Sequence, residues 1–108
     1  MKNNELFNKL KKSGLPVAYH HFSKSQAPPF LVYLVTSQSD YGADDINLLT
    51  KTNYRVELIT DKKDLISENL IDNLLNFVEF EKSEVYINEE KIYQVSYDFT
   101  IIEKKEGN

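Results

Sequence analysis

The carboxyl-terminal third of the chain contains a segment in which apolar and polar residues alternate. From position 92 to position 102, the apolar or aromatic positions are Tyr93, Val95, Tyr97, Phe99 and Ile101. The positions between them are polar: Gln94, Ser96, Asp98 and Thr100. Successive side chains of a strand point to opposite faces, so this pattern predicts a strand with one buried and one wet face. Residues 53–60 alternate in the same way, which favours a largely antiparallel sheet.

Two segments have helical spacing of apolar residues. The first, residues 4–13, is short and ends before Gly14. The second, residues 65–78, follows Asp61 or Asp64 as a predicted N-cap. Its apolar positions are Ile66, Leu70, Ile71, Leu74, Leu75 and Val78. The pattern therefore predicts one short helix and one long helix.

Three further strands complete the predicted fold. Residues 17–22 form a short one, the apolar run "FLVYLVT" at 30–36 forms a buried one, and residues 81–87 pair with 92–102 through a turn at "NEE". The order is α-β-β-β-α-β-β, and we expect an α+β fold in which the sheet packs against both helices. All 108 residues form one domain, 1–108. A mobile loop is expected at about 37–52 and a flexible tail at about 103–108.

Composition excludes several classes of protein. The chain has no cysteine, which removes disulfide frameworks and thiol catalysis. Its net charge is −4, so we expect no sequence-specific nucleic-acid binding. No apolar run approaches the roughly 18 to 20 residues that a membrane helix needs, and no membrane partner is predicted. Synthesis in a reducing cytoplasm fits these features.

No motif for catalysis or for a cofactor is present. The sequence lacks an HExxH pair, a G-x-S-x-G elbow and a glycine-rich phosphate loop. His20 and His21 would point to opposite faces of a strand, which argues against shared metal binding. Acidic pairs such as Glu89 and Glu90 are typical of solvated surface. We therefore predict a protein that is not an enzyme and has no cofactor and no metal site.

Three blocks of sequence resemble the tail-completion or tail-terminator structural proteins of long-tailed phages and prophages of Gram-positive bacteria. The first is Pro16-Val17-Ala18-Tyr19, Phe22, Pro28-Pro29-Phe30 and Val32-Tyr33; the second is Tyr54, Glu57 and Leu58 before Thr60-Asp61-Lys62-Lys63-Asp64; the third is Glu90, Tyr93 and Val95. Ile59 departs from the family pattern, in which an aromatic residue is usual. The stretch "INLL" after "DYGADD" also departs, because the family is more polar there.

This resemblance implies a non-enzymatic subunit that forms a ring, of six copies, at the head-proximal end of the tail tube. Such a ring terminates tail polymerisation and mediates head-tail joining. The implied partners are further copies of the chain, the tail tube protein and the head-tail connector or neck protein. The implied location is the tail or neck of the virion, after synthesis in the bacterial host cytoplasm. A neck or head-completion protein and a stand-alone protein-binding regulatory module remain alternatives.

Several residues are candidates for interfaces between subunits. Aromatic side chains anchor interfaces as well as cores. Tyr19, Tyr33, Tyr41 and Tyr86 are the candidates to reach the surface, and a position in the core is the alternative for each. Acidic residues at a lumen or rim would let DNA slide without binding, and Asp44, Asp45, Glu57 and Asp61 are candidates for that role. The full set of predicted interface residues is Tyr19, Pro28, Pro29, Phe30, Tyr33, Tyr41, Asp44, Asp45, Glu57, Asp61, Lys62 and Lys63.

Overall fold

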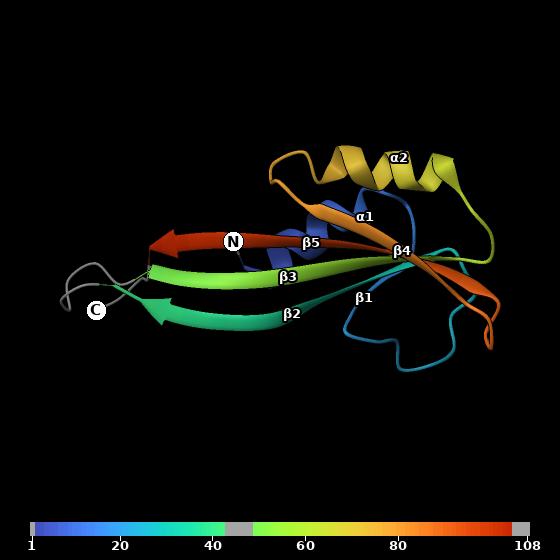
Figure 1. Cartoon of the computed structure of the whole chain (residues 1–108), viewed down its shortest axis with the longest axis horizontal. Helices are drawn as coiled ribbons and strands as arrows, with labels where there is room; N and C mark the ends of the chain where they lie inside the picture. The colour runs from blue at the N-terminus through green and yellow to red at the C-terminus, as the bar shows by residue number, and fades with distance from the viewer. Residues whose placement is uncertain (1, 43–48, 105–108) are drawn as a thin grey trace.

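The computed structural model describes residues 2–42 and 49–104 and forms an α+β fold (Figure 1). Its elements are α1 (Asn3–Lys11), β1 (Val17–Tyr19), β2 (Phe30–Tyr41), β3 (Leu49–Thr60), α2 (Leu65–Leu74), β4 (Glu81–Ile87) and β5 (Ile92–Lys104). The five strands form one sheet in the order β1-β2-β3-β5-β4. All neighbouring strands are antiparallel except β1 and β2. The predicted fold class, with a largely antiparallel sheet and two helices, is confirmed.

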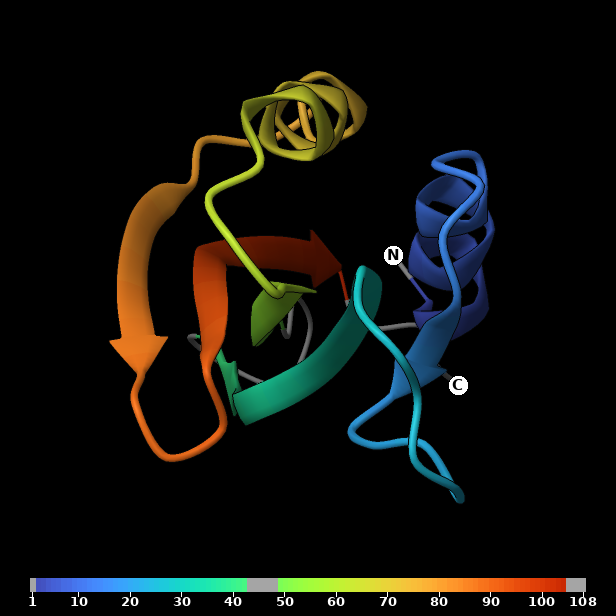
Figure 2. The ribbon, with the colours of Figure 1, turned by 90° about the vertical axis from the view of Figure 1, so that its right-hand side faces the viewer.

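Both helices cover the same face of the curved sheet, and the core lies between them and the sheet (Figure 2). Leu6 and Leu10 of α1 are fully buried, as is Ile71 of α2. The sheet supplies the alternating positions predicted to face inward, including Val56 and Tyr97, which are also fully buried. Packing against the sheet therefore holds in place a nine-residue helix that would be marginal in water by itself.

The helices are nearly equal in length, so the prediction of one long and one short helix was wrong. Helix α2 has ten residues and ends at Leu74. The apolar spacing continues past that point because Leu75 still packs into the core after the backbone has left the helix. Ile66 and Leu70, predicted on the buried stripe, are 84% and 37% exposed. Neither described helix has the length and apolar character to span a bilayer.

Three strands extend beyond the part of the sheet that the helices cover (Figure 1). We call this extension the arm, and it comprises residues 37–41 of β2, 49–53 of β3 and 100–104 of β5. Side-chain hydrogen bonds cross it, from Gln38 to Thr52 at 2.9 Å and from Thr50 to Asp40 at 2.9 Å. The arm makes the molecule elongated, with extents of 50 × 27 × 26 Å.

The arm corrects two boundary predictions. Much of the expected loop at 37–52 is strand, and residues 103 and 104, expected to belong to a flexible tail, belong to β5. Polar side chains lie on both faces of the arm's β2 segment, so the sequence there carries no alternating signal. Residues 43–48, which include Asp44 and Asp45, and residues 105–108 lie outside the described part of the chain.

Candidate functional site

The proline-containing segment before β2 is a scaffold for a parallel strand pair. Pro16 accepts a hydrogen bond from the backbone N–H of Leu31 at 2.8 Å, and the N–H of His20 donates to the carbonyl of Tyr33 at 2.8 Å. β1 is thereby held against β2, but it ends at Tyr19 and is shorter than predicted. Two of the predicted interface residues, Pro28 and Pro29, are joined by a cis peptide bond and lead directly into β2.

The predicted interface tyrosines differ in exposure. Tyr19, Tyr41 and Tyr86 are 43%, 44% and 43% exposed, as expected for residues at the surface. Tyr33 is only 5% exposed, so for this residue the structure selects the core position over the surface one. It packs edge-on against Tyr19 at 5.1 Å between ring centroids, and burial raises the pKa of its hydroxyl.

His20 and His21 lie just after the end of β1, where the chain turns. His20 has a positive φ of 69°, and the Nδ1 atoms of the two rings are 3.3 Å apart. The expectation that they point to opposite faces of a strand was therefore wrong, because neither residue belongs to the strand. Both side chains are exposed. Within residues 2–42 and 49–104, no cluster of three or more metal-ligating side chains is found.

The face of the sheet opposite the helices carries a groove of about 600 Å³. Phe30, Glu57, Ile59 and Gln94 line it from the sheet, and the loop at 20–26 closes one side. The carboxylate of Glu57 accepts a hydrogen bond from Gln94 at 3.3 Å, and burial raises its pKa. Two predicted interface residues, Phe30 and Glu57, therefore share one surface.

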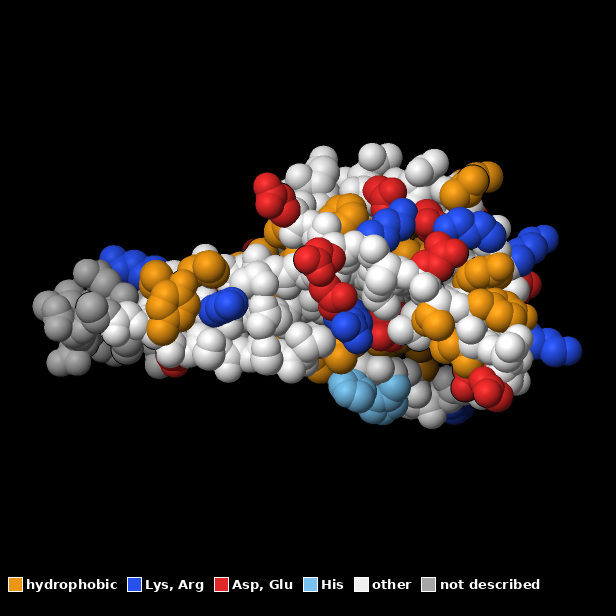
Figure 3. All heavy atoms as spheres, in the orientation of Figure 1, with side chains coloured by type: hydrophobic (Ala, Val, Ile, Leu, Met, Phe, Trp, Pro, Cys, Tyr) orange, Lys and Arg blue, Asp and Glu red, His pale blue; other side chains and the backbone are white. Residues whose placement is uncertain are grey.

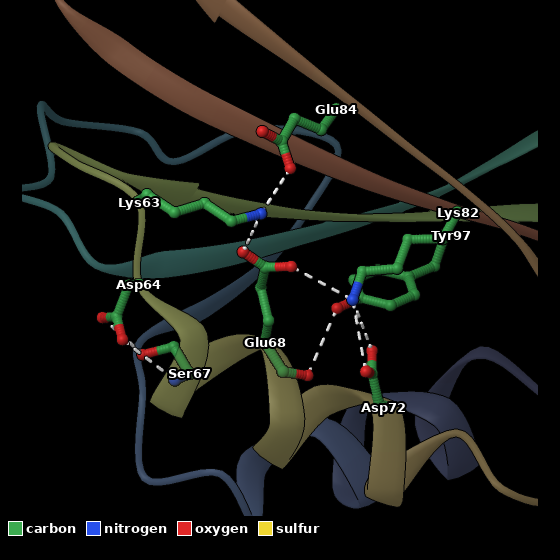
Figure 4. A network of polar contacts seen from close by, with 8 residues as sticks. All are labelled: Lys63, Asp64, Ser67, Glu68, Asp72, Lys82, Glu84 and Tyr97. Atoms are coloured by element: carbon green, nitrogen blue, oxygen red, sulfur yellow. Dashed lines mark hydrogen bonds and ion pairs between the residues drawn. The ribbon is translucent and has the colours of Figure 1, made fainter.

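A network of charged side chains joins α2 to the edge strand β4 (Figure 4). Its centre is Glu68, which is 3% exposed. The ammonium of Lys63 lies 2.7 Å from this carboxylate and also contacts Glu84 of β4. The ammonium of Lys82 lies 3.1 Å from Glu68 and 3.1 Å from Asp72. Each lysine thus bridges α2 and the strand.

The electrostatics of this network favour its charged form. Burial raises the pKa of Glu68, but hydrogen bonds from Lys63 and Lys82 outweigh that effect and hold it below its ordinary value. Hydrogen bonds to Glu68 and Glu84 raise the pKa of Lys63 above its usual range. The tyrosine hydroxyl of Tyr97 donates to the carbonyl of Glu68 at 3.4 Å. This network of ion pairs fixes the helix on the sheet.

Sequence reasoning named Lys63 but missed the rest of this network. Its one signal was the spacing of Glu68 and Asp72, four residues apart on one side of a helix. Nothing in the sequence alone places Lys82 beside them, because the contact depends on how β4 passes the helix.

The remaining predicted interface residues do not join one patch. Asp61 and Lys62 are exposed in the turn between β3 and α2. Tyr41 lies at the outer end of the arm, far along the molecule from that turn (Figure 1). The described candidates are thus spread over the groove, the turn, the β1 region and the arm.

Comparison with known proteins gives a likeness in fold. No family model matches the sequence, and no curated protein matches it. A chain from the virion of a native gene transfer agent particle has a TM-score of 0.69 and 8% sequence identity, with 93% of this chain and 92% of that chain covered. A second solved structure has a TM-score of 0.58 and 13% identity, with 100% and 99% covered. At such low identity, these likenesses show that the fold is shared.

Proposed function

We propose that this chain is a non-enzymatic structural protein of a phage-like virion. Within that class, the proposed role is a ring of six copies at the head-proximal end of the tail tube, which terminates tail polymerisation and mediates head-tail joining. Its partners would be other copies of the chain, the tail tube protein and the head-tail connector or neck protein. It would be made in the cytoplasm of a bacterial host and end in the tail or neck of the virion.

One observation carries this proposal: the fold is shared over 93% of the chain with a chain of a gene transfer agent virion. Coverage of 92% of that other chain means that the likeness extends over both molecules and is not confined to a common motif. The three sequence blocks that resemble tail-completion proteins support the finer role. The charged groups described above pair with one another between α2 and β4, as expected for a structural protein.

This proposal assigns different roles to the candidate interface residues. The exposed tyrosines Tyr19 and Tyr41 lie along the β2 side of the sheet and would contact neighbouring subunits. The acidic candidates would face the lumen or rim, where negative charge keeps DNA from binding: Asp44, Asp45, Glu57 and Asp61.

The experiment that tests this function is deletion of the gene from the parent phage, followed by electron microscopy of the particles. Overlong tails without heads are the expected result, because nothing would stop tube growth. Tails of normal length beside heads that leak DNA would contradict termination and assign the chain to the head side of the neck. Normal infectious particles would reject a virion role and favour the regulatory module. Complementation with the wild-type gene controls for effects on neighbouring genes.

A further inference from the structure

The arm has two strand edges with no neighbour among the described residues. β1 pairs with β2 only at residues 31–33, so the outer edge of β2 continues past it. The N–H of Val35 on this edge donates to the hydroxyl of Tyr19 at 3.3 Å. Beyond it, residues 36–39 have β3 on their inner side and no described strand on their outer side. On the other side of the sheet, β4 pairs with β5 only as far as Asp98, so residues 99–102 pair with β3 and have no described strand on their outer side.

These two edges lack the features that normally protect a strand edge. Charges, prolines or very short length discourage pairing with another chain. β1 has only three residues, and β4 carries Glu81, Lys82 and Glu84. The two open edges, which run from the base of the arm into it, have the sequences Thr-Ser-Gln-Ser at 36–39 and Phe-Thr-Ile-Ile at 99–102, with no charge and no proline. They are therefore the stretches of this sheet best suited to accept a further strand.

A groove of about 940 Å³ lies beside the edge of β5. Residues 77–80, which connect α2 to β4, and Glu81 of β4 form part of its wall, and residues 98–102 of β5 form another part. Thr36 of β2 and Asn53 and Tyr54 of β3 also line it. Phe77 and Ile102 are 36% and 54% exposed there. Figure 3 shows hydrophobic side chains gathered on the arm near its outer end. A strand added to β5 would cover some of this apolar surface.

Charge is distributed unequally between the two sides of the sheet. Residues 2–30, which form α1, β1 and the loop on the β2 side, contain five lysines and one glutamate. Residues 61–104, which form α2, β4 and β5 on the other side, contain five lysines and eleven acidic residues. Figure 2 shows α1 and β1 at one side of the sheet and β4 at the opposite side. The two sides of one molecule are thus complementary in charge.

We propose that copies of this chain join side by side, with residues 99–102 of β5 in one copy pairing with residues 36–39 of β2 in the next. The sheet then continues from copy to copy. β2 and β5 are both antiparallel to β3, so the added pair is parallel and the same step repeats. Contacts of this kind join different patches of identical subunits and close into a ring when the rotation allows. This inference rests on the proposed ring and names the surfaces that build it.

Charge and strand direction indicate that the strand added to each edge comes from a second copy of this chain. Pairing β5 of one copy with β5 of another would bring two acidic sides together. Pairing β5 with β2 brings the acidic side of one copy against the basic side of the next, which is electrostatically favourable. Strand addition then supplies backbone hydrogen bonds along both edges.

The absence of native cysteine allows a disulfide test of this contact. Ser39 and Ile102 each pair with Lys51, so within one chain they lie at the same level on either side of β3. Two strand spacings, about 10 Å, separate them. That exceeds the roughly 7 Å limit between Cα atoms for a disulfide, so a bond between Ser39→Cys and Ile102→Cys must join two chains.

The experiment introduces these variants into the parent phage and oxidises purified virions, with parallel samples of concentrated purified protein. Ser37→Cys, Ser39→Cys and Tyr41→Cys are each combined with Ile102→Cys, because the three positions lie on one face and sample three registers. Particles that contain both single variants should give a crosslinked dimer for one register, and the double variant should give a ladder that ends at the ring. Each single variant alone should stay monomeric.

The control places the second cysteine on another edge. Ser83→Cys in the charged strand β4 should not crosslink to Ser39→Cys. Virions that contain the chain but show no mixed crosslink in any register would overturn the edge pairing and leave the virion role standing. Efficient dimers of Ile102→Cys alone would overturn it in favour of a two-fold contact. Virions that lack the chain would instead reject the proposed function.

Discussion

Glu57 and Glu68 are two carboxylates whose surroundings shift their pKa values in opposite directions. Glu68 lies under α2 with two lysines bound to it, and its pKa is lowered. Glu57 lies on the open face of the sheet, where burial is the largest effect and raises its pKa. Glu68 therefore stabilises the fold when it is ionised, and Glu57 does so when it is protonated.

Replacement of Glu68 by glutamine should destabilise the protein by about 1 to 2 kcal/mol at neutral pH. The change keeps the shape but leaves Lys63 and Lys82 without their shared partner. This loss is smaller than for a fully buried pair because both lysines are partly exposed. Urea unfolding of both proteins measures it, with the exposed Glu90→Gln as the matched control, expected within about 0.5 kcal/mol of wild type.

The difference in unfolding free energy between wild type and Glu68→Gln should depend on pH. The pKa of Glu68 is lowered in the fold, so its stabilising effect is fully present above the ordinary value of about 4.3 and is lost as pH falls through the folded pKa. The stability gap between wild type and Glu68→Gln should therefore narrow below about pH 4. A gap that stays constant down to pH 2 would contradict the ion pairing.

Glu57→Gln should have the opposite sign. The raised pKa means that ionised Glu57 is disfavoured in the fold at neutral pH, although Arg55 and His20 offset part of this and Asp98 adds to it. Glutamine removes the charge and can still accept from Gln94. We expect a gain in unfolding free energy of less than about 1 kcal/mol at pH 7, which disappears as pH falls below the ordinary carboxylate value. Thermal unfolding at pH 7 and pH 3 checks both parts.

At the scale of elements, α2 shows how a single side chain fixes a helix start. Two aspartates precede the helix, and the sequence allowed either as the N-cap. In the structure Asp64 accepts from the backbone N–H of Ser67 at 3.0 Å and from its hydroxyl at 2.8 Å. These hydrogen bonds lower the pKa of Asp64. The geometry of the turn therefore selects Asp64 over Asp61.

Asp64→Ala should cost about 1 kcal/mol, because it leaves helix N–H groups without their acceptor. Asp61→Ala is the matched control: the same residue types are exchanged three positions earlier, in an exposed turn, and the change should be near zero. Urea unfolding of both variants gives the comparison. Equal losses for the two variants would show that the cap contributes nothing beyond the general loss of a charge.

The elements also show where sequence patterns stop being informative. The alternation from Tyr93 to Phe99 predicted β5 well, because one face of that segment is buried by the helices. Past Thr100 the strand continues into the arm, where no helix covers it. Residues 37–41 are likewise not covered by a helix, and their residue types are typical of turns. Their strand conformation comes from pairing with β3, which local sequence does not encode.

At the scale of the whole molecule, the separation of charge across the sheet predicts salt-sensitive association. The basic side of one copy meets the acidic side of the next in the proposed contact. Raising the salt concentration from about 0.1 M to 1 M shortens the screening length from about 10 Å to about 3 Å, so assemblies should shift toward smaller species. Sedimentation velocity at both concentrations measures this shift.

Charge variants make this prediction specific. The double variant Lys11→Glu with Lys12→Glu places acid on the basic side and should weaken association most at low salt. The double variant Lys62→Glu with Lys91→Glu makes the same change in charge on the already acidic side and should not weaken association. Equal effects of the two changes would mean that net charge, and not its placement, controls association.

The sequence by itself determined the α+β class, the alternating faces of β3 and β5, the existence of both helices and the absence of recognisable catalytic motifs. These follow from local patterns, because periodicity and turn chemistry act between near neighbours in the chain. Tertiary structure alone decided the position of Tyr33 in the core, the Glu68 network, the end of α2 and the strands of the arm. Each of those depends on which distant segment lies alongside, and burial, pairing and pKa are set by that neighbour.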